Sequence, residues 1–375
     1  MTTEHAARMG LAAAQDAGDA GLAKLVRQLG AVEVWRHLRS GRSQTAMAQR
    51  ASQIDCSDLA RQTEAIKARF VIPSDEQWPV LVGDLAWSEL VGGFGGEPLG
   101  LWMIGHADLA QLGPSLAMVG SRASTTYGEH VAADWAAGVA ERGYPVVSGG
   151  AYGIDSSAHR AAIAVSGQTV AVMAGGLARL YPVGNTSLLQ AVQDHGVIVS
   201  EFPPDRPPSR SRFLVRNRLI AALARATVIV EAACRSGAHN TVSWALSLQR
   251  PVLAAPGPVT SALSVTPHRL IRSGEATLVT SVDEILAAVT PIDTGVPDYP
   301  HQQPTLFDSL SVEQRRVHEI LPATRGACVD ELSVLTGESA GSLMVCLAWL
   351  KQIGLAIETA PGIWCAQPGN RKEMK

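Results

Sequence analysis

The stretch SLAMVGSRASTTYGEHVAADWAAGVAERGYPVVSGG, residues 115–150, places an apolar run, a turn rich in Gly and Ser, an amphipathic segment and a second apolar run in succession. The runs are almost continuously apolar, which is typical of parallel strands that helices cover on both faces. The same alternation continues through QTVAVMAGG, VIVSE, TVIVEA and RPVLAAPG. We therefore predict an α/β fold over residues 111–290, with a doubly wound, mostly parallel sheet.

The segments on either side of this domain have different patterns. Residues 1–75 are rich in Ala, Leu and Gln at helical spacing and predict a small helical module. Residues 76–110 are rich in Gly and Trp and predict a connector with short extended pieces. After a proline-rich linker at 291–305, residues 306–367 predict three helices and a hairpin in the order of a winged-helix domain, followed by a tail at 368–375.

The charge of residues 301–375 argues against DNA binding by this part of the chain. Residues 301–375 contain seven Lys or Arg against eight Asp or Glu, and the third predicted helix carries only Lys351. A winged helix that binds duplex DNA often does so through this helix. We therefore expect this domain to contact protein or to support a dimer.

The composition limits the class of protein. The 375 residues carry a formal net charge of -3 and 46% are hydrophobic, which is typical of a globular chain without general affinity for nucleic acid or membranes. Five cysteines without C-x-x-C spacing predict neither a disulfide framework nor a zinc site. The N-terminus is polar and no apolar run is long enough to span a bilayer, so we expect a cytoplasmic protein without a membrane anchor.

Loops at the predicted strand ends are candidates for ligand binding, because open α/β sheets bind ligands at the carboxyl ends of their strands. Three of these loops are GSRAST, SGGAYGID and EAACRSGAHNT, and backbone N–H groups of such turns suit phosphates. The alternative is that backbone geometry alone requires the glycines. The sequence has neither G-x-G-x-x-G nor G-x-x-x-x-G-K-[ST], so we predict no cofactor and consider a polynucleotide backbone as the ligand.

Arginines gather around an aromatic residue in SRSRFLVRNRLIAAL, residues 209–223. Residues 203–218 hold five arginines and one acidic residue, and four of the arginines surround Phe213: Arg210, Arg212, Arg216 and Arg218. Guanidinium groups bind phosphates, and an aromatic at a groove edge offers a stacking face to an unpaired base. This pattern favours single-stranded over duplex nucleic acid. The alternative is that Phe213 and Leu214 fill the core while the arginines form a solvated face.

Several motifs together resemble those of the DprA/Smf family of bacterial DNA-processing proteins. They are SLAMVGSRASTTYG, VVSGGAYGIDSSAHRAA, GQTVAVMAGGLARLYPVGN, VSEFPP, FLVRNRLIAAL and VIVEAACRSGAHNTVSWAL followed by RPVLAAPG, in the family's order over roughly residues 110–285. The resemblance implies an extended Rossmann-like domain that binds single-stranded DNA and forms a homodimer. It also implies that the protein protects incoming DNA and loads the RecA recombinase onto it during natural transformation, without a catalytic reaction.

Matched position by position, the family motifs imply a DNA-binding surface. Arg122, with Ser121 and Ser124, would hold a phosphate, and Phe213 would stack on a base. Tyr152 stands where the family usually has Arg or Lys, which removes one expected positive contact. The complete predicted set is Ser121, Arg122, Ser124, Tyr152, Arg210, Arg212, Phe213, Arg216, Asn217, Arg218, Ser236 and Gly237.

A second hypothesis is an enzyme, because the fold and the glycine-rich rim are similar to those of nucleotide-processing phosphoribohydrolases of the lysine-decarboxylase-like group. Those proteins carry the pattern P-G-G-x-G-T-x-x-E. This chain has Pro256, Gly257 and Pro258 without an acidic residue soon after, so the catalytic glutamate has no counterpart there. Asp155 and His159, four residues apart, are expected to cap a helix rather than to form an acid/base pair.

Overall fold

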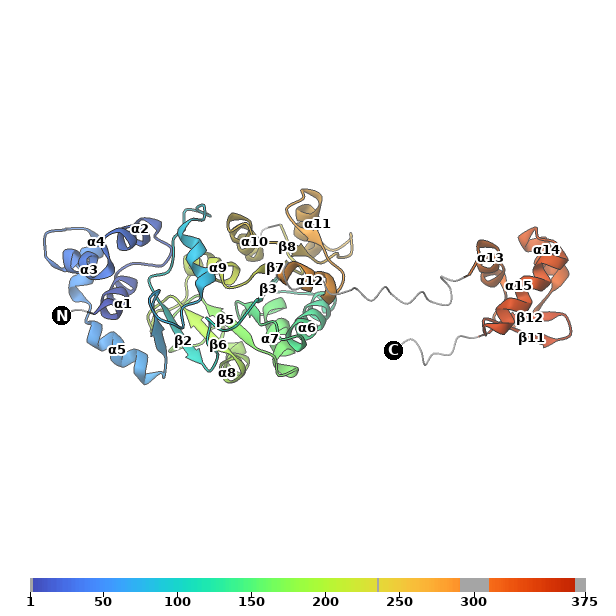
Figure 1. Ribbon diagram of the computed structural model, residues 1–375, viewed down its shortest axis with the longest axis horizontal. Coiled ribbons are helices and arrows are strands. Elements are labelled where there is room, and N and C mark those ends of the chain that lie inside the picture. The colour runs from blue at the N-terminus through green and yellow to red at the C-terminus, as the bar shows by residue number, and fades with distance from the viewer. Residues whose placement is uncertain (1–2, 235, 291–309, 368–375) are drawn as a thin grey trace. The chain divides into compact units, whose positions relative to one another are not determined.

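The computed structural model describes residues 3–234, 236–290 and 310–367 of the chain. The chain divides into two compact units, Met1–Val296 and Pro297–Lys375. In Figure 1 the first unit is coloured from blue to orange and the second is red. The first unit contains a large mixed sheet, and the second contains a small antiparallel sheet.

Nine strands form the sheet of the first unit, in the order β1-β2-β6-β5-β4-β3-β7-β8-β9. Their bounds are β1 Arg69–Val71, β2 Leu101–Gly105, β3 Leu116–Val119, β4 Val146–Ser148, β5 Thr169–Met173, β6 Val197–Ser200, β7 Ala226–Ile229, β8 Val252–Ala254 and β9 Thr277–Leu278. The strands from β6 to β9 are parallel to their neighbours. Among the described residues of this sheet, the antiparallel pairs are β1 with β2 and β2 with β6. The predicted α/β fold with a mostly parallel sheet is confirmed.

Helices cover both faces of the sheet, as the continuous apolar runs predict. Leu116 and Met118 of β3 pack with α6 Thr126–Glu141, α7 Ile154–Ala164 and α12 Val282–Val289. The alternate residues of the same strand pack on the opposite face with α9 Arg210–Ala222 and α10 Gly237–Ser247. The remaining elements of this domain are α8 Thr186–His195, α11 Val265–Arg272 and the 3-10 turns η1 Val80–Ala86, η2 Val183–Asn185 and η3 Ala262–Ser264.

The strand order changes direction at β3, and this fixes where a ligand can bind. From β3 the chain moves outward through β4, β5 and β6, and it then returns to place β7 on the other side of β3. In doubly wound sheets, ligands bind outside the carboxyl ends of the strands at such a reversal. Here that place lies between the loop that follows β3 and the loop that follows β7.

The N-terminal helices form a module with its own core, in which Leu11 and Trp35 are buried. Their bounds are α1 Glu4–Ala14, α2 Ala20–Leu29, α3 Ala31–Arg39, α4 Ala46–Gln53 and α5 Cys56–Ala65. β1 lies within the predicted helical module, and β2 lies within the predicted connector with its short extended pieces. Both strands extend the sheet beyond β6. A three-residue strand such as β1 is too short for hydrophobic periodicity to reveal it. The predicted domain limits stay a prediction.

The C-terminal unit has the elements that its sequence predicts, three helices and a hairpin. Their bounds are α13 Val312–Ile320, β10 Ala327–Cys328, α14 Val329–Thr336, α15 Ala340–Gln352, β11 Ala356–Ala360 and β12 Ile363–Ala366. The winged-helix assignment stays a prediction, and the predicted linker and tail lie outside the described residues. Within the described ranges, no single helix is long and apolar enough to cross a membrane, and only α14 and α15 reach that length and composition together, as a pair bent by 106°.

Candidate nucleic-acid interface

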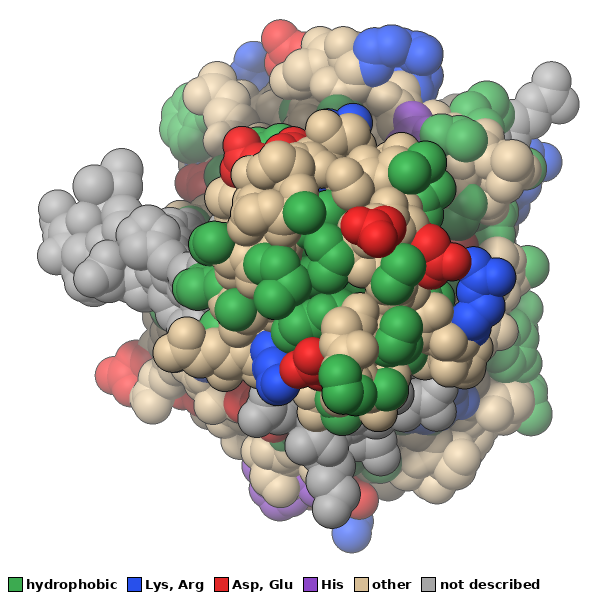
Figure 2. Space-filling view, turned by 90° about the vertical axis from the view of Figure 1, so that its right-hand side faces the viewer, with side chains coloured by type: hydrophobic (Ala, Val, Ile, Leu, Met, Phe, Trp, Pro, Cys, Tyr) green, Lys and Arg blue, Asp and Glu red, His purple; other side chains and the backbone are tan. Residues whose placement is uncertain are grey.

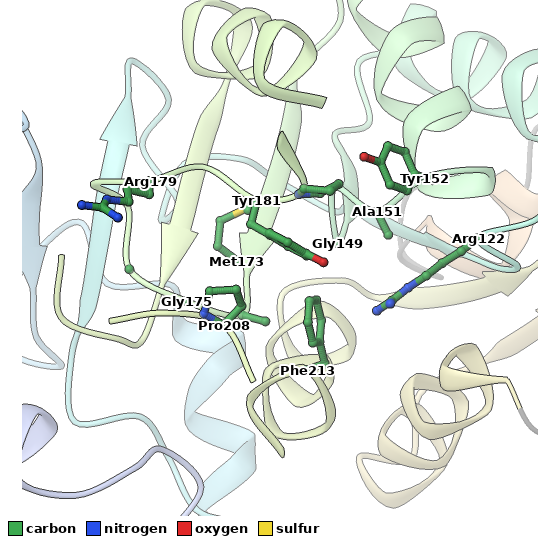
Figure 3. A pocket seen from close by; sticks show the side chains of 13 residues that line it. Arg122, Gly149, Ala151, Tyr152, Met173, Gly175, Arg179, Tyr181, Pro208 and Phe213 are labelled. Atoms are coloured by element: carbon green, nitrogen blue, oxygen red, sulfur yellow. The ribbon is translucent and has the colours of Figure 1, made fainter. Parts of the chain in front are cut away.

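A groove of about 2230 Å³ runs along the carboxyl-end rim of the sheet, where the strand order reverses. Residues that line it include Ser121, Arg122, Arg210, Phe213, Asn217 and Gly237. A side pocket of about 530 Å³ opens beside the groove, next to the turns that follow β4 and β5. Residues that line the side pocket include Arg122, Tyr152, Met173, Arg179, Tyr181 and Phe213 (Figure 3). The two hollows share Arg122 and Phe213, so these side chains stand at the boundary between them.

Helix α9 carries the aromatic side chain to this boundary. A proline-rich turn at 203–208 precedes the helix, and proline prevents regular structure there. Ser209 then caps α9, because its hydroxyl accepts a hydrogen bond from the backbone N–H of Arg212 at 3.4 Å. From Val215 onward the helix is buried against the sheet. The accessible side chains that α9 presents to the groove therefore lie before Val215.

Phe213 is half-buried and makes contacts with three other functional side chains. The guanidinium carbon of Arg122 lies 4.7 Å from its ring centroid, and that of Arg216 lies 5.8 Å away. The ring of Tyr181 lies 5.9 Å away, centroid to centroid, at an interplanar angle of 59°. Figure 3 shows Phe213, Tyr181 and Arg122 converging from three segments of the chain. Distances of this size are typical of cation–π and tilted aromatic pairs.

Arg216 lies beneath Phe213 and Tyr181, which we call the aromatic cluster, and is only 4% exposed. Its Nη1 donates hydrogen bonds to the carbonyl oxygen of Gly149, at 2.7 Å, and to that of Val172. Burial lowers the pKa of Arg216 to about 10, although the nearby carboxylate of Asp155 acts in the opposite direction. A side chain at position 149 would place its Cβ 2.6 Å from the guanidinium, so this turn needs glycine. Arg216 thus joins α9 to the ends of β4 and β5.

Hydrogen bonds between α9 and α10 build the opposite wall of the groove. The amide nitrogen of Asn217 donates to the carbonyl oxygen of Gly237, at 3.3 Å, and to Oδ1 of Asn240, at 3.2 Å. Ser236 caps α10, because its hydroxyl accepts from the N–H of Ala238 at 3.2 Å. This wall is polar, and the aromatic cluster lies across from it on the same groove.

Carboxylates of the chain itself occupy backbone N–H groups at the N-terminus of α6 and in the turn before α7. Glu231 accepts hydrogen bonds from the N–H and the hydroxyl of Thr125, the N-cap of α6, at 2.9 and 2.6 Å. A Cβ at Gly128 would lie 2.3 Å from the same carboxylate. Asp155 accepts from the N–H groups of Gly149 and Ala151 in the turn before α7. A helix N-terminus that already holds a carboxylate is not available to a phosphate.

Comparisons with known proteins show the family to which this chain belongs. The family model for DNA recombination-mediator protein A matches residues 69–290. The putative DNA processing protein DprA of Mycobacterium tuberculosis is 45% identical over 354 residues, which cover 92% of this chain and 89% of that protein. This chain belongs to the DNA recombination-mediator protein A family.

Two structures of DprA proteins have a similar fold. The X-ray structure of DprA from Streptococcus pneumoniae is similar with a TM-score of 0.66 and 29% sequence identity, over 78% of this chain and 100% of that one. The structure of DprA from Helicobacter pylori is similar with a TM-score of 0.52 and 24% identity, over 59% of this chain and 94% of that one. The family's role is in DNA processing and the mediation of recombination.

Most of the predicted DNA-binding residues line the groove or the side pocket. Ser121, Arg122, Arg210, Phe213, Arg216, Asn217, Ser236 and Gly237 line the groove, and Tyr152 lines the side pocket, where it is half-exposed. Arg122 and Arg210 are exposed, whereas Arg216 lies under the surface. The alternative that Phe213 fills the core does not fit its half-buried place at the edge of both hollows.

Three predicted DNA contacts lie away from both hollows. Arg218 is fully buried and forms an ion pair with Glu201, because five positions after Phe213 the helix turns that side chain away from the groove. Arg212 points to the N-terminal module, where it pairs with Asp16 at 2.9 Å. The hydroxyl of Ser124 donates to the carboxylate of Glu129 at 2.9 Å. The full burial of Arg218 contradicts its assignment to DNA, whereas the assignments of Arg212 and Ser124, which have partners within the chain, stay predictions.

Sequence reasoning missed three residues that line the hollows. Arg179 and Tyr181 line the side pocket, and both lie after β5 in GQTVAVMAGGLARLYPVGN, one of the motifs that resemble the DprA/Smf family. Their position after a strand end is the signal that could have identified them. Asn240 lines the groove one turn into α10, and helical spacing from Ser236 would have pointed to it.

Proposed function

We propose that this chain binds single-stranded DNA in the groove, with Phe213 as the stacking platform for one base. The observation that carries the proposal is the position of Phe213 between Arg122 and Tyr181, at the boundary of the groove and the side pocket. Stacking on an aromatic face is available to an unpaired base and not to a base inside a duplex. The DprA structure from Helicobacter pylori is described as revealing a single-stranded DNA binding mode, which supports the same reading for this family member.

The phosphates of the strand would bind the exposed arginines around the platform. Arg122, Arg179 and Arg210 are exposed and line one or both hollows. Because Glu231 occupies the N-cap of α6 and Asp155 occupies the N–H groups of the turn before α7, we expect the phosphates to bind guanidinium groups on this rim. Neutralising about three phosphates on a single strand predicts a log–log salt slope of about −2.

A competition titration tests the choice of nucleic acid. A fluorescent single-stranded oligonucleotide is bound to the full chain, and unlabelled single strand or duplex of the same sequence is added. The proposal expects single strand to displace the probe at a much lower concentration than duplex. If duplex competes as well as single strand, the stacking platform is not what holds the DNA.

We propose further that the bound strand is passed to a RecA recombinase and that the chain acts as a homodimer. The family's role in recombination mediation supports this proposal. Filament assembly by RecA on single strands covered with single-strand-binding protein should speed up when this protein is added. Sedimentation at rising protein concentration tests the dimer, and a protein that stays monomeric and leaves the filament rate unchanged contradicts this step.

No catalytic step forms part of the proposal. A phosphoribohydrolase needs a carboxylate that is free to act on a sugar at the rim. Of the rim carboxylates, Glu231 accepts hydrogen bonds from Thr125, and Asp155 is 7% exposed with a pKa raised by burial. Incubation with nucleoside monophosphates should release no free base, and release of base at a rate that Glu231→Gln abolishes would favour the enzyme.

A further inference from the structure

The C-terminal unit exposes large apolar side chains on three helices. The exposed fractions are 81% for Val312 on α13, 85% and 65% for Val334 and Leu335 on α14, and 48% and 72% for Met344 and Val345 on α15. Figure 2 shows a face of this unit on which hydrophobic side chains gather beside Asp and Glu. Exposed apolar groups that cluster in so small a unit mark an interaction surface.

A groove of about 690 Å³ lies between α13 and the first half of α15. We call it the α13–α15 groove. Residues that line it include Glu313, Val317, Glu338, Leu343, Val345 and Cys346. Val317 and Leu343 are buried and form its apolar floor, and the exposed Val345 stands at its edge. A groove between two helices with an apolar floor has the shape that accepts the apolar ridge of a third helix.

The charged residues that line this groove are both carboxylates. Burial raises the pKa of the Cys346 thiol, and the negative charges of Glu313 and Glu338 raise it further, so both carboxylates act on the floor of the groove. A hydrogen bond from the Ser311 hydroxyl lowers the pKa of Glu313, so this group stays ionised. Lys351, the one charged residue in the sequence of α15, pairs with Glu358 at 3.0 Å.

We propose that the α13–α15 groove docks an amphipathic helix of a partner protein that carries Lys or Arg beside its apolar side chains. The apolar floor would take the apolar ridge of that helix, and Glu313 and Glu338 would pair with its cations. A nucleic acid would bring phosphates against the same two carboxylates. A symmetric contact of this groove with itself would bring like charges together, because each copy would present the same residues. This inference does not depend on DNA binding by the first unit.

Selection from a phage-displayed library of random helical peptides on the full chain tests the proposal. Enriched peptides should share apolar residues three or four positions apart with Lys or Arg beside them. Synthetic copies, followed by fluorescence anisotropy, should bind at least about tenfold more weakly to Val345→Asp and to the double variant Glu313→Lys/Glu338→Lys. Val345 and Glu313 are exposed and Glu338 is half-buried, so the unit should stay folded in these variants, which circular dichroism checks.

Two matched controls carry the same changes elsewhere. Val80→Asp alters an equally exposed valine of the first unit, and Glu319→Lys reverses an exposed charge on α13 that does not line the groove. Both should bind the peptides within about twofold of the unchanged chain. The proposal is overturned if no peptide family is enriched, if the enriched peptides are acidic, or if Val345→Asp leaves their affinity unchanged. It is also overturned if Val345→Asp converts a dimer to a monomer, because the occupant is then a second copy.

Discussion

The guanidinium of Arg122 lies 4.7 Å from the centre of the Phe213 ring, although the two residues are 91 positions apart in the chain. One comes from the turn after β3 and the other from the first turn of α9. The contact places a fixed positive charge beside an aromatic face at the edge of a groove. Such a pair can bind the phosphate and the base of one nucleotide together.

Replacement of Arg122 by alanine should remove one phosphate contact. Single-strand affinity should fall, and the log–log salt slope should become flatter by about 0.7, because one charge fewer is neutralised. Fluorescence anisotropy at several salt concentrations measures both quantities. The control is Arg160→Ala, which removes an exposed arginine of α7 that lines neither hollow, and its slope should match that of the unchanged chain. Equal slopes for all three proteins would contradict the assignment of Arg122.

Arg212→Ala should leave the salt slope unchanged, in contrast to Arg122→Ala. The Arg212 side chain is directed to Asp16 and to the carbonyl oxygen of Pro207, away from the groove. Asp16 is 57% exposed, so loss of the pair should cost only about 0–1 kcal/mol of unfolding free energy. Urea unfolding and the salt titration measure the two effects. A flatter slope for Arg212→Ala would mean that this arginine reaches DNA after all.

Arg218→Met should destabilise the fold without a specific effect on DNA. It leaves Glu201 buried without its ion-pair partner, and such a loss costs about 3–5 kcal/mol. Burial already raises the pKa of Glu201, and Arg218 opposes that rise, so the pKa in the variant should be higher still. A carboxyl group with a raised folded-state pKa stabilises the fold most when it is protonated, so the variant should regain stability as the pH falls.

The matching experiment compares urea unfolding of Arg218→Met at neutral and acidic pH. The double variant Arg218→Met/Glu201→Leu should recover much of the lost stability at neutral pH, because the uncompensated charge is gone. If the single variant is as stable as the unchanged chain, the buried ion pair is not the reason for this arginine.

His159 should make the stability of the fold depend on pH. Its Nδ1 lies 2.7 Å from the hydroxyl oxygen of Thr169, which itself donates to the carbonyl oxygen of Val146, so Nδ1 is the donor. Burial lowers the pKa of His159 from 6.5 to about 3. Unfolding therefore takes up a proton at acidic pH, and stability should fall by about 1.4 kcal/mol per pH unit as the pH drops from 6.5 toward 3.

The comparison of the unchanged chain with His159→Gln isolates this effect. The carboxyl groups contribute equally to both proteins. The unfolding free energy of the unchanged chain should therefore fall relative to that of His159→Gln as the pH falls through this window. A difference that is constant between pH 7 and pH 4.5 would show that His159 is not buried in its neutral form.

The sequence could predict the sheet because its strands are buried on both faces. Continuous runs such as that of β3 have no other common explanation when amphipathic segments separate them. The short edge strand β1 was missed, since three residues do not establish a period. The order of the strands also lay beyond local patterns, because the reversal at β3 depends on how distant segments pack.

The candidate site could be predicted in part. The sequence pointed to the turn after β3 and the first turn of α9, which line one groove, because strand ends and helix starts have recognisable sequence patterns. The sequence could not predict which side chains of α9 face the groove and which are buried. Its sequence has no apolar stripe, so helical periodicity could not show that Arg218 is buried while Arg210 is exposed. That division is made by Glu201, which lies in a different loop and offers Arg218 a partner.

Phe213→Ala and Phe213→Trp distinguish a stacking platform at position 213 from a side chain that fills the core. Single-strand affinity, its salt slope and the urea unfolding free energy are measured for both. We expect Phe213→Ala to lose about 1–3 kcal/mol of binding free energy with an unchanged salt slope. Phe213→Trp should bind at least as well as the unchanged chain, and both variants should stay folded. A loss of about 3–5 kcal/mol of unfolding free energy with normal DNA affinity for Phe213→Ala would contradict the stacking platform and place the ring in the core.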